Sequence, residues 1–162
     1  LRIQKHFGMQ DAEHYPEVAG NAKMNEFQAA MGLCNLRHVD AEIQKRKTAV
    51  YRYIERLSDV PGITPWQEQP GITHNYAYFP VLFDKEVFGK SRDEVSDLLA
   101  AQDIFARKYF YPITSTFSCY DSKFPIAKTP IAEAVSKQVL TLPLYADLSI
   151  EDVDRICDVI LN

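Results

Sequence analysis

Hydrophobic residues recur at helical spacing along the first third of the chain. Phe27, Met31 and Cys34 stand at positions i, i+4 and i+7, the spacing of one apolar face of a helix. A similar series continues through Ile43, Val50, Ile54 and Leu57. Charged residues fill the positions between 42 and 56, as on the wet face of an amphipathic helix. The pattern predicts one long helix from Asn25 to about Ser58.

The remainder of the chain alternates between strand-like and helix-like segments. The predicted strands are residues 75–83, 104–111 and 138–142, and the predicted helices begin at Ser91, Thr129 and Ser149. Ser91 and Ser149 are each followed three residues later by an acidic residue that completes a cap, and Pro130 occupies a first helical position. This order predicts an α+β fold, in which a long helix precedes a small sheet of about three strands covered by helices.

Proline and glycine suggest how the chain is divided. Pro61 and Gly62 follow the long helix, and such a pair ends regular structure. We therefore expect residues 1–58 to form a linker segment and the long helix, and residues 59–162 to form a small α+β domain, the two making one compact unit. Pro80 lies within the first predicted strand and has no backbone N–H, which places that strand at a sheet edge or a bulge.

Composition limits the classes of partner and compartment. The 162 residues are 46% hydrophobic and 12% aromatic with a net charge of −4, which indicates an ordered globular chain and gives no reason to expect nucleic acid or an anionic membrane as partner. The three cysteines are widely spaced, as in a cytoplasmic protein with reduced thiols. Two of them fall on predicted helix faces and are expected to be buried.

One stretch carries a chemical signal. Gly20 and Asn21 favour an abrupt turn, and Asn25 with Gln28 has the spacing of a capping box that opens the long helix. Lys23 then lies beside a helix N-terminus, where free N–H groups and the helix dipole favour an anion such as phosphate. The alternative is an ordinary capped helix beside a solvated lysine.

Motifs of a self-contained active site are absent from the sequence. No nucleophile elbow or glycine-rich phosphate loop occurs, and the four histidines have no metal-ligand spacing. His6 is interpreted as a surface residue.

Three segments resemble one enzyme family. GNAKMNEFQAAMGLCNLRHVD at 20–40, ARKYFYP at 106–112 and TLPLYADLSIEDVDRICDVI at 141–160 are similar to motifs of the DegT/StrS-type aminotransferases, which use pyridoxal 5'-phosphate. The resemblance covers nearly the whole chain and only the C-terminal portion of the family, and the absence of an initial Met is in line with a segment of a longer protein.

The resemblance implies specific roles. The lysine that carries the cofactor lies upstream of the matched region, so no catalytic residue is expected here and the segment is expected to be inactive alone. Asn21 and Lys23 would contact the cofactor phosphate of the neighbouring subunit, which implies a homodimer. Tyr109 and Tyr111 would approach the sugar substrate and, if 104–111 is a strand, share one of its faces.

The implied activity is transfer of an amino group, from L-glutamate as amino donor, to a nucleotide-linked keto sugar, in the cytoplasm. Two alternatives remain open at this point. One is a pyridoxal-phosphate sugar dehydratase of the same family, and the other is a non-catalytic dimerisation or regulatory domain.

Overall fold

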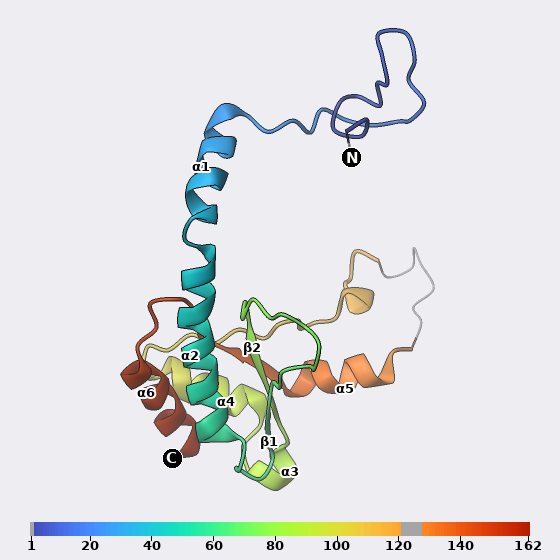
Figure 1. Ribbon diagram of the computed structural model, residues 1–162. Helices are drawn as coiled ribbons and strands as arrows, with labels where there is room; N and C mark the ends of the chain where they lie inside the picture. The colour runs from blue at the N-terminus through green and yellow to red at the C-terminus, as the bar shows by residue number, and fades with distance from the viewer. Residues whose placement is uncertain (1, 121–127) are drawn as a thin grey trace. The chain divides into compact units, whose positions relative to one another are not determined.

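The computed structural model describes residues 2–120 and 128–162, and the chain forms two compact units, residues 1–40 and residues 41–162. Figure 1 labels the helices and strands of both. None of the described helices combines the length and apolarity needed to cross a membrane.

The first unit pairs residues 5–7 with the segment that precedes α1. The abrupt turn predicted at Gly20 and Asn21 does not form, because Asn21 lies in an antiparallel bridge with His6. Phe7 N–H donates to the Gly20 carbonyl and Ala22 N–H donates to the Lys5 carbonyl, both at 3.0 Å. Helix α1 (Glu26–Leu36) begins after Asn25, and the predicted capping box is confirmed: the Asn25 side chain accepts from Gln28 N–H, and the Gln28 side chain accepts from Asn25 N–H. This start of the helix is therefore closed by its own side chains.

The prediction of a single helix from 25 to 58 is wrong at one point. Helix α1 ends at Leu36 and α2 (Val39–Leu57) begins three residues later. Between them, Arg37 N–H donates to Cys34 and His38 N–H donates to Asn35, which are i→i−3 bonds that tighten the chain out of α-helical geometry. No residue of α1 is buried.

The second unit is built on a three-stranded antiparallel sheet with the order β1 (Ile63–Pro65), β2 (Phe79–Phe83), β3 (Val139–Leu142). Strands β2 and β3 were predicted. Strand β1 was not predicted, because a three-residue strand that ends in a proline gives almost no periodic signal. The α+β class is confirmed.

Pro80 occupies the central strand, so the predicted edge position is wrong. Its partner on β3 is Thr141, whose N–H and carbonyl both bond to Arg107 on the far side, at 2.8 and 3.0 Å. Towards β1, the Pro80 carbonyl accepts from Trp66 N–H just beyond the end of that strand. The missing N–H of Pro80 therefore interrupts no interior rung of the ladder.

Residues 104–111 are not the predicted strand. Only Arg107 pairs with β3, through an isolated bridge to Thr141. Immediately afterwards Tyr109 N–H bonds to the Arg107 carbonyl and Tyr111 N–H to the Lys108 carbonyl. These local turns remove the extended geometry on which the shared face of Tyr109 and Tyr111 depended.

Helices surround the sheet (Figure 1). After β2 come α3 (Lys85–Phe88) and α4 (Arg92–Ala100), then a short 3₁₀ turn (Thr114–Thr116), α5 (Pro130–Gln138) and, after β3, α6 (Ile150–Leu161). The caps at Ser91 and Ser149 and the proline at the start of α5 are confirmed. Val95 and Leu99 of α4 are buried, whereas Leu98 is exposed.

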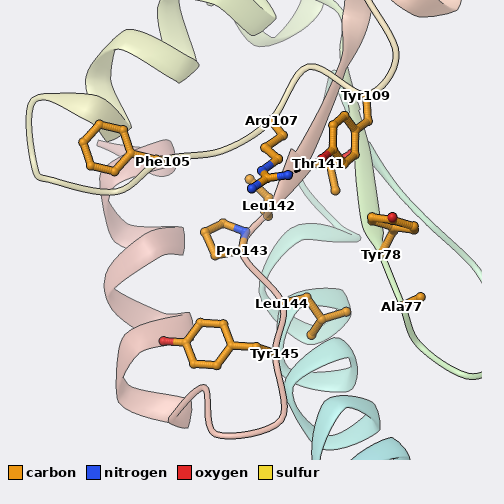
Figure 2. A pocket seen from close by; sticks show the side chains of 10 residues that line it. All are labelled: Ala77, Tyr78, Phe105, Arg107, Tyr109, Thr141, Leu142, Pro143, Leu144 and Tyr145. Carbon is orange, nitrogen blue, oxygen red and sulfur yellow. Dashed lines mark hydrogen bonds between the residues drawn. The ribbon is translucent and has the colours of Figure 1, made fainter. Parts of the chain in front are cut away.

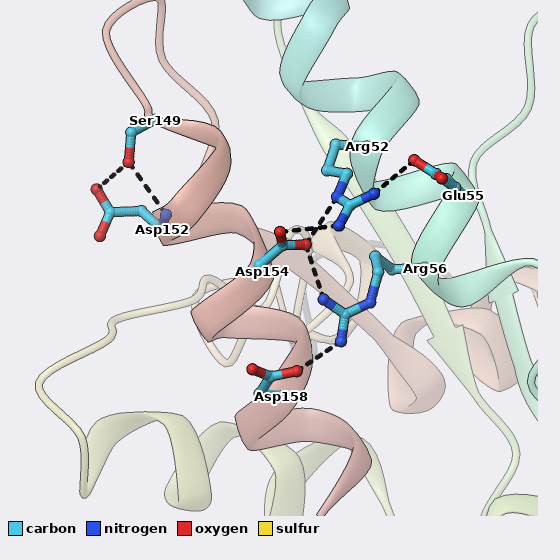
Figure 3. A network of polar contacts seen from close by, with 7 residues as sticks. All are labelled: Arg52, Glu55, Arg56, Ser149, Asp152, Asp154 and Asp158. Carbon is cyan, nitrogen blue, oxygen red and sulfur yellow. Dashed lines mark hydrogen bonds and ion pairs between the residues drawn. The ribbon is translucent and has the colours of Figure 1, made fainter.

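Helices α2 and α6 are joined by ion pairs (Figure 3). Arg52 binds Asp154 through Nε at 2.7 Å and Nη2 at 2.9 Å, and Arg56 Nη1 contacts the same carboxylate at 2.7 Å. Arg56 also reaches Asp158. The two arginines stand one turn apart on α2 and fix its register against α6.

Candidate functional site

Residues 20–24, which form no turn, contain the residues predicted to hold phosphate. Asn21 forms a bridge with His6, because the segment around residues 5–7 runs antiparallel to 20–22. Asn21 and Lys23 are both exposed. No local pattern predicts this pairing, because it joins two segments separated by a long loop, so His6 and Phe7 were missed as neighbours of Asn21 and Lys23.

Lys23 contacts a histidine and an aromatic ring. Its Nζ lies 3.3 Å from His6 Nδ1 and 4.9 Å from the centroid of the Phe7 ring. An ammonium can only donate, so His6 Nδ1 is the acceptor in this contact. Among the described residues no carboxylate forms an ion pair with Lys23.

This arrangement fits a phosphate group, with one change from the sequence-based expectation. The capping box already occupies the N–H of Gln28, so the helix start offers fewer free donors than its position suggests. The remaining side-chain donors are the Lys23 ammonium and the Asn21 amide, both on exposed residues. A set of donors without carboxylates suits an oxyanion and does not suit a metal cation.

A second candidate site lies in the unit of residues 41–162. A cavity of about 280 Å³ opens there (Figure 2). Its lining comes from three segments and consists of Ala77, Tyr78, Phe105, Arg107, Tyr109, Thr141, Leu142, Pro143, Leu144 and Tyr145. Tyr109, a predicted substrate residue, is therefore part of a cavity wall.

Arg107 is the charged group of this cavity, and sequence reasoning missed it. Its backbone is tied to Thr141 in both directions, and its Nη1 donates to the Tyr109 hydroxyl. The Tyr78 ring lies edge-on to the Tyr109 ring, with 5.6 Å between the ring centroids. The position of Arg107 could have been predicted from the alternation of side chains along a strand, but residues 104–111 do not form a strand.

Tyr111 lies in different surroundings from Tyr109. The Arg92 guanidinium carbon is 4.9 Å from the centroid of the Tyr111 ring, and Tyr111 is not among the residues that line the cavity. Arg92 is 2% exposed and donates from Nη1 to the carbonyls of Ser136 and Val139, each at 3.1 Å. The structure thus separates the two predicted substrate tyrosines.

Asp93, the next residue of α4, binds the segment that contains Tyr109 through Lys108. It contacts the Lys108 ammonium and pairs with Arg92 Nε at 3.0 Å. The hydrogen bond from Lys108 is the main reason that the pKa of Asp93 lies below its usual value. Residues 92 and 93 therefore fix the chain on both sides of Tyr109.

A sequence model of the DegT/DnrJ/EryC1/StrS aminotransferase family matches residues 1–161. The chain belongs to this family. As a member of the DegT/DnrJ/EryC1/StrS aminotransferases, it confirms the predicted resemblance over nearly its whole length.

Curated relatives of this family member include sugar transaminases. The dTDP-4-amino-4,6-dideoxy-D-glucose transaminase of Escherichia coli is 39% identical over 100% of the chain and 44% of its own length. GDP-perosamine synthase of Vibrio cholerae is 29% identical over 90% of the chain and 39% of its own length. The chain thus spans about two-fifths of these relatives, in agreement with the predicted C-terminal portion.

Solved structures share the fold. The crystal structure of DesI in the presence of its TDP-sugar product matches 99% of this chain and 41% of the DesI chain, with a TM-score of 0.86 and 30% identity. The sugar aminotransferase Spr1654 from Streptococcus pneumoniae, in its PMP form, matches with a TM-score of 0.81 at 23% identity over 98% of this chain and 42% of its own.

Proposed function

We propose that this chain is part of a pyridoxal-phosphate-dependent aminotransferase that moves an amino group from L-glutamate to a nucleotide-linked keto sugar. The observation that carries the proposal is the exposed Lys23, two residues after Asn21, with which no carboxylate of the described residues forms an ion pair. The names of the relatives, which are transaminases of dTDP-linked and UDP-linked amino sugars, support the substrate class.

Pyridoxal 5'-phosphate, when bound, supplies the electron sink that amino-group transfer requires. This chain's own contribution is to hold the phosphate: Lys23 provides a positive charge and the Asn21 amide provides a donor. His6 accepts a hydrogen bond from Lys23 and so directs the ammonium. The lysine that binds the cofactor covalently is assigned to the rest of the enzyme, and residues 1–162 alone are expected to be inactive.

The proposed division of labour needs two subunits. Asn21 and Lys23 would serve the phosphate of the neighbouring subunit, so the enzyme would be a homodimer. Helix α1 offers a surface for such contact, because Phe27, Met31 and Leu36 are exposed by 88%, 63% and 68% and exposed apolar residues on one element mark interaction sites. We also propose that residues 1–58 form the linker and long-helix part of the enzyme and that residues 59–162 form its small domain.

Cofactor affinity of the whole protein tests the proposal. Titration of pyridoxal 5'-phosphate, followed by visible absorption, is compared for the wild type, Lys23→Met, Lys23→Arg and Asn21→Ala. Loss of one charge-assisted contact is expected to weaken binding about tenfold to a hundredfold in Lys23→Met, with Lys23→Arg largely restoring it.

Lys137→Met is the matched control, since Lys137 is an exposed residue of the last turn of α5 and should leave affinity unchanged. A wild-type spectrum that responds to L-glutamate supports an aminotransferase. A cofactor spectrum that no amino donor alters would instead favour the sugar dehydratase, and no cofactor binding at all would favour a non-catalytic domain.

A further inference from the structure

Arg107 lines a cavity whose walls are partly aromatic. The lining holds four aromatic residues and no acidic residue: Tyr78, Phe105, Tyr109 and Tyr145 are the aromatic ones. Figure 2 shows these rings spread around the arginine, with Pro143 and Leu144 along the wall. Among the described residues no carboxylate forms an ion pair with Arg107, so its guanidinium remains available to an external anion.

The guanidinium is oriented before any ligand arrives. The backbone of Arg107 is held by two hydrogen bonds to Thr141, and its Nη1 is held by the Tyr109 hydroxyl. Guanidinium has five N–H donors in a fixed fork. Only one nitrogen is engaged by a described side chain, and the fork geometry of the rest matches a phosphate or a carboxylate.

We propose that this cavity is an oxyanion subsite for substrate, in which Arg107 binds the phosphate or carboxylate of a small organic molecule whose ring or sugar lies against Tyr78. The inference rests on the proposed function and assigns a residue and a subsite within it. Aromatic faces pack well against sugars and bases. The ion pair between Arg107 and the oxyanion would orient the ligand.

The size of the cavity limits what it holds. About 280 Å³ is at the lower end of ligand pockets, which commonly measure about 300–1,000 Å³. The cavity therefore accommodates one oxyanion with the adjoining ring, not a whole nucleotide sugar. Two substrates of the proposed reaction carry such a group, the nucleotide sugar through its phosphates and the amino donor through its carboxylates.

Isothermal titration of the whole cofactor-loaded protein with thymidine 5'-diphosphate and, separately, with 2-oxoglutarate tests the subsite and identifies the source of the oxyanion. Arg107→Met should weaken one of these ligands about tenfold to a hundredfold, the loss expected for a charged hydrogen-bonded pair. Weakened diphosphate binding assigns the subsite to the nucleotide, and weakened 2-oxoglutarate binding assigns it to the amino donor.

Two variants separate this role from a loss of structure. Arg107→Lys keeps the charge without the fork and should bind with intermediate affinity. Tyr109→Phe removes the hydroxyl that holds Nη1 and keeps the ring, so a change of no more than about threefold is expected. Arg155→Met is the matched control, because Arg155 is exposed and donates to the Gln102 carbonyl outside this cavity.

Unchanged affinity of Arg107→Met for both ligands would overturn the subsite, as would a cofactor-loaded wild type that binds neither ligand. These results are distinguishable from failure of the proposed function, because cofactor loading is read independently in the visible spectrum. A protein that binds and uses its cofactor normally, yet is indifferent to Arg107, removes only this inference.

Discussion

Tyr53 combines an apolar and a polar role at one buried position. It is 0% exposed and stacks on Phe79 of β2 at 4.9 Å, while its hydroxyl donates to the Pro143 carbonyl at 3.0 Å. Burial raises the pKa of Tyr53 above its ordinary value, so the phenol stays protonated and remains a donor at all physiological pH values. It thereby joins α2 to the segment that follows β3.

Tyr53→Phe is expected to destabilise this region by about 1–3 kcal/mol, because the Pro143 carbonyl loses its donor inside the protein. Hydrogen–deuterium exchange of peptides from α2 and β2 measures the change. Tyr51→Phe is the control, since its hydroxyl bonds to Glu68 at an exposed position, and an effect as large as that of Tyr53→Phe would contradict the argument.

The three cysteines differ in solvent exposure, and the sequence did not predict which of them are buried. Cys157 is buried on α6 as predicted for a cysteine on a helix face, whereas Cys34 on α1 is exposed, as is Cys119. Burial raises the pKa of the Cys157 thiol to about 12. Only the thiolate reacts readily with alkylating reagents.

We expect iodoacetamide at pH 8 to leave Cys157 unmodified in the folded protein, with labelling appearing only as the pH approaches 12 or the protein unfolds. Cys119 should be labelled at pH 8. Peptide mass spectrometry gives the extent at each site, and rapid labelling of Cys157 at pH 8 would show that α6 opens readily.

At the scale of elements, the ion pairs of Arg52 and Arg56 with Asp154 make the packing of α2 on α6 less stable at low pH. Hydrogen bonding from Arg52 is the main cause that lowers the pKa of Asp154 below 3.8. A carboxylate with a lowered pKa in the folded state contributes stability above its unfolded pKa, and that contribution is lost as the pH falls through the folded value.

Asp154→Asn should therefore lower the melting temperature at pH 6, and the difference from wild type should shrink as the pH falls below about 3.8. Thermal unfolding followed by circular dichroism between pH 6 and pH 2.5 provides the comparison. Asp147→Asn serves as control, because Asp147 is 83% exposed and pairs only with Lys45 among the described residues. A pH-independent gap would contradict an electrostatic origin.

Elements with a local chemical signal were predicted well, and those that depend on distant partners were not. The caps at Asn25, Ser91 and Ser149 follow from side chains three residues apart, and all three occur. Strand β1 and the bridge at Arg107 exist only because β2 and β3 are there to pair with them. The candidate sites depend on distant partners in the same way: the contact of Lys23 with His6 and the position of Arg107 in the cavity were not predicted.

At the scale of the whole molecule, α1 displays apolar side chains that no described residue buries. Met24, Phe27, Met31, Leu33 and Leu36 are all exposed by more than 60%. A Cβ added at Gly32 would meet no atom within 4 Å, so the close backbone approach that a glycine within a helix suggests does not arise within the described chain. Such an exposed apolar surface indicates an interaction site, and in the proposed homodimer the second subunit would cover it.

Met31→Asp is expected to shift the whole protein from dimer towards monomer, because dimerisation would bury the introduced carboxylate without a partner. Sedimentation velocity over a range of protein concentrations measures the shift. Glu26→Gln is the control, as Glu26 lies in the first turn of the same helix. An unchanged dimer in Met31→Asp would remove α1 from the interface.

The closed start of α1 has a consequence for cofactor exchange. The capping box and the backbone bonds from Phe7 and Ala22 hold residues 20–25 through contacts within the chain itself. If these residues bind phosphate as proposed, little conformational entropy is lost on binding, as in preorganised loops. Cofactor release from the proposed enzyme would then require no local refolding.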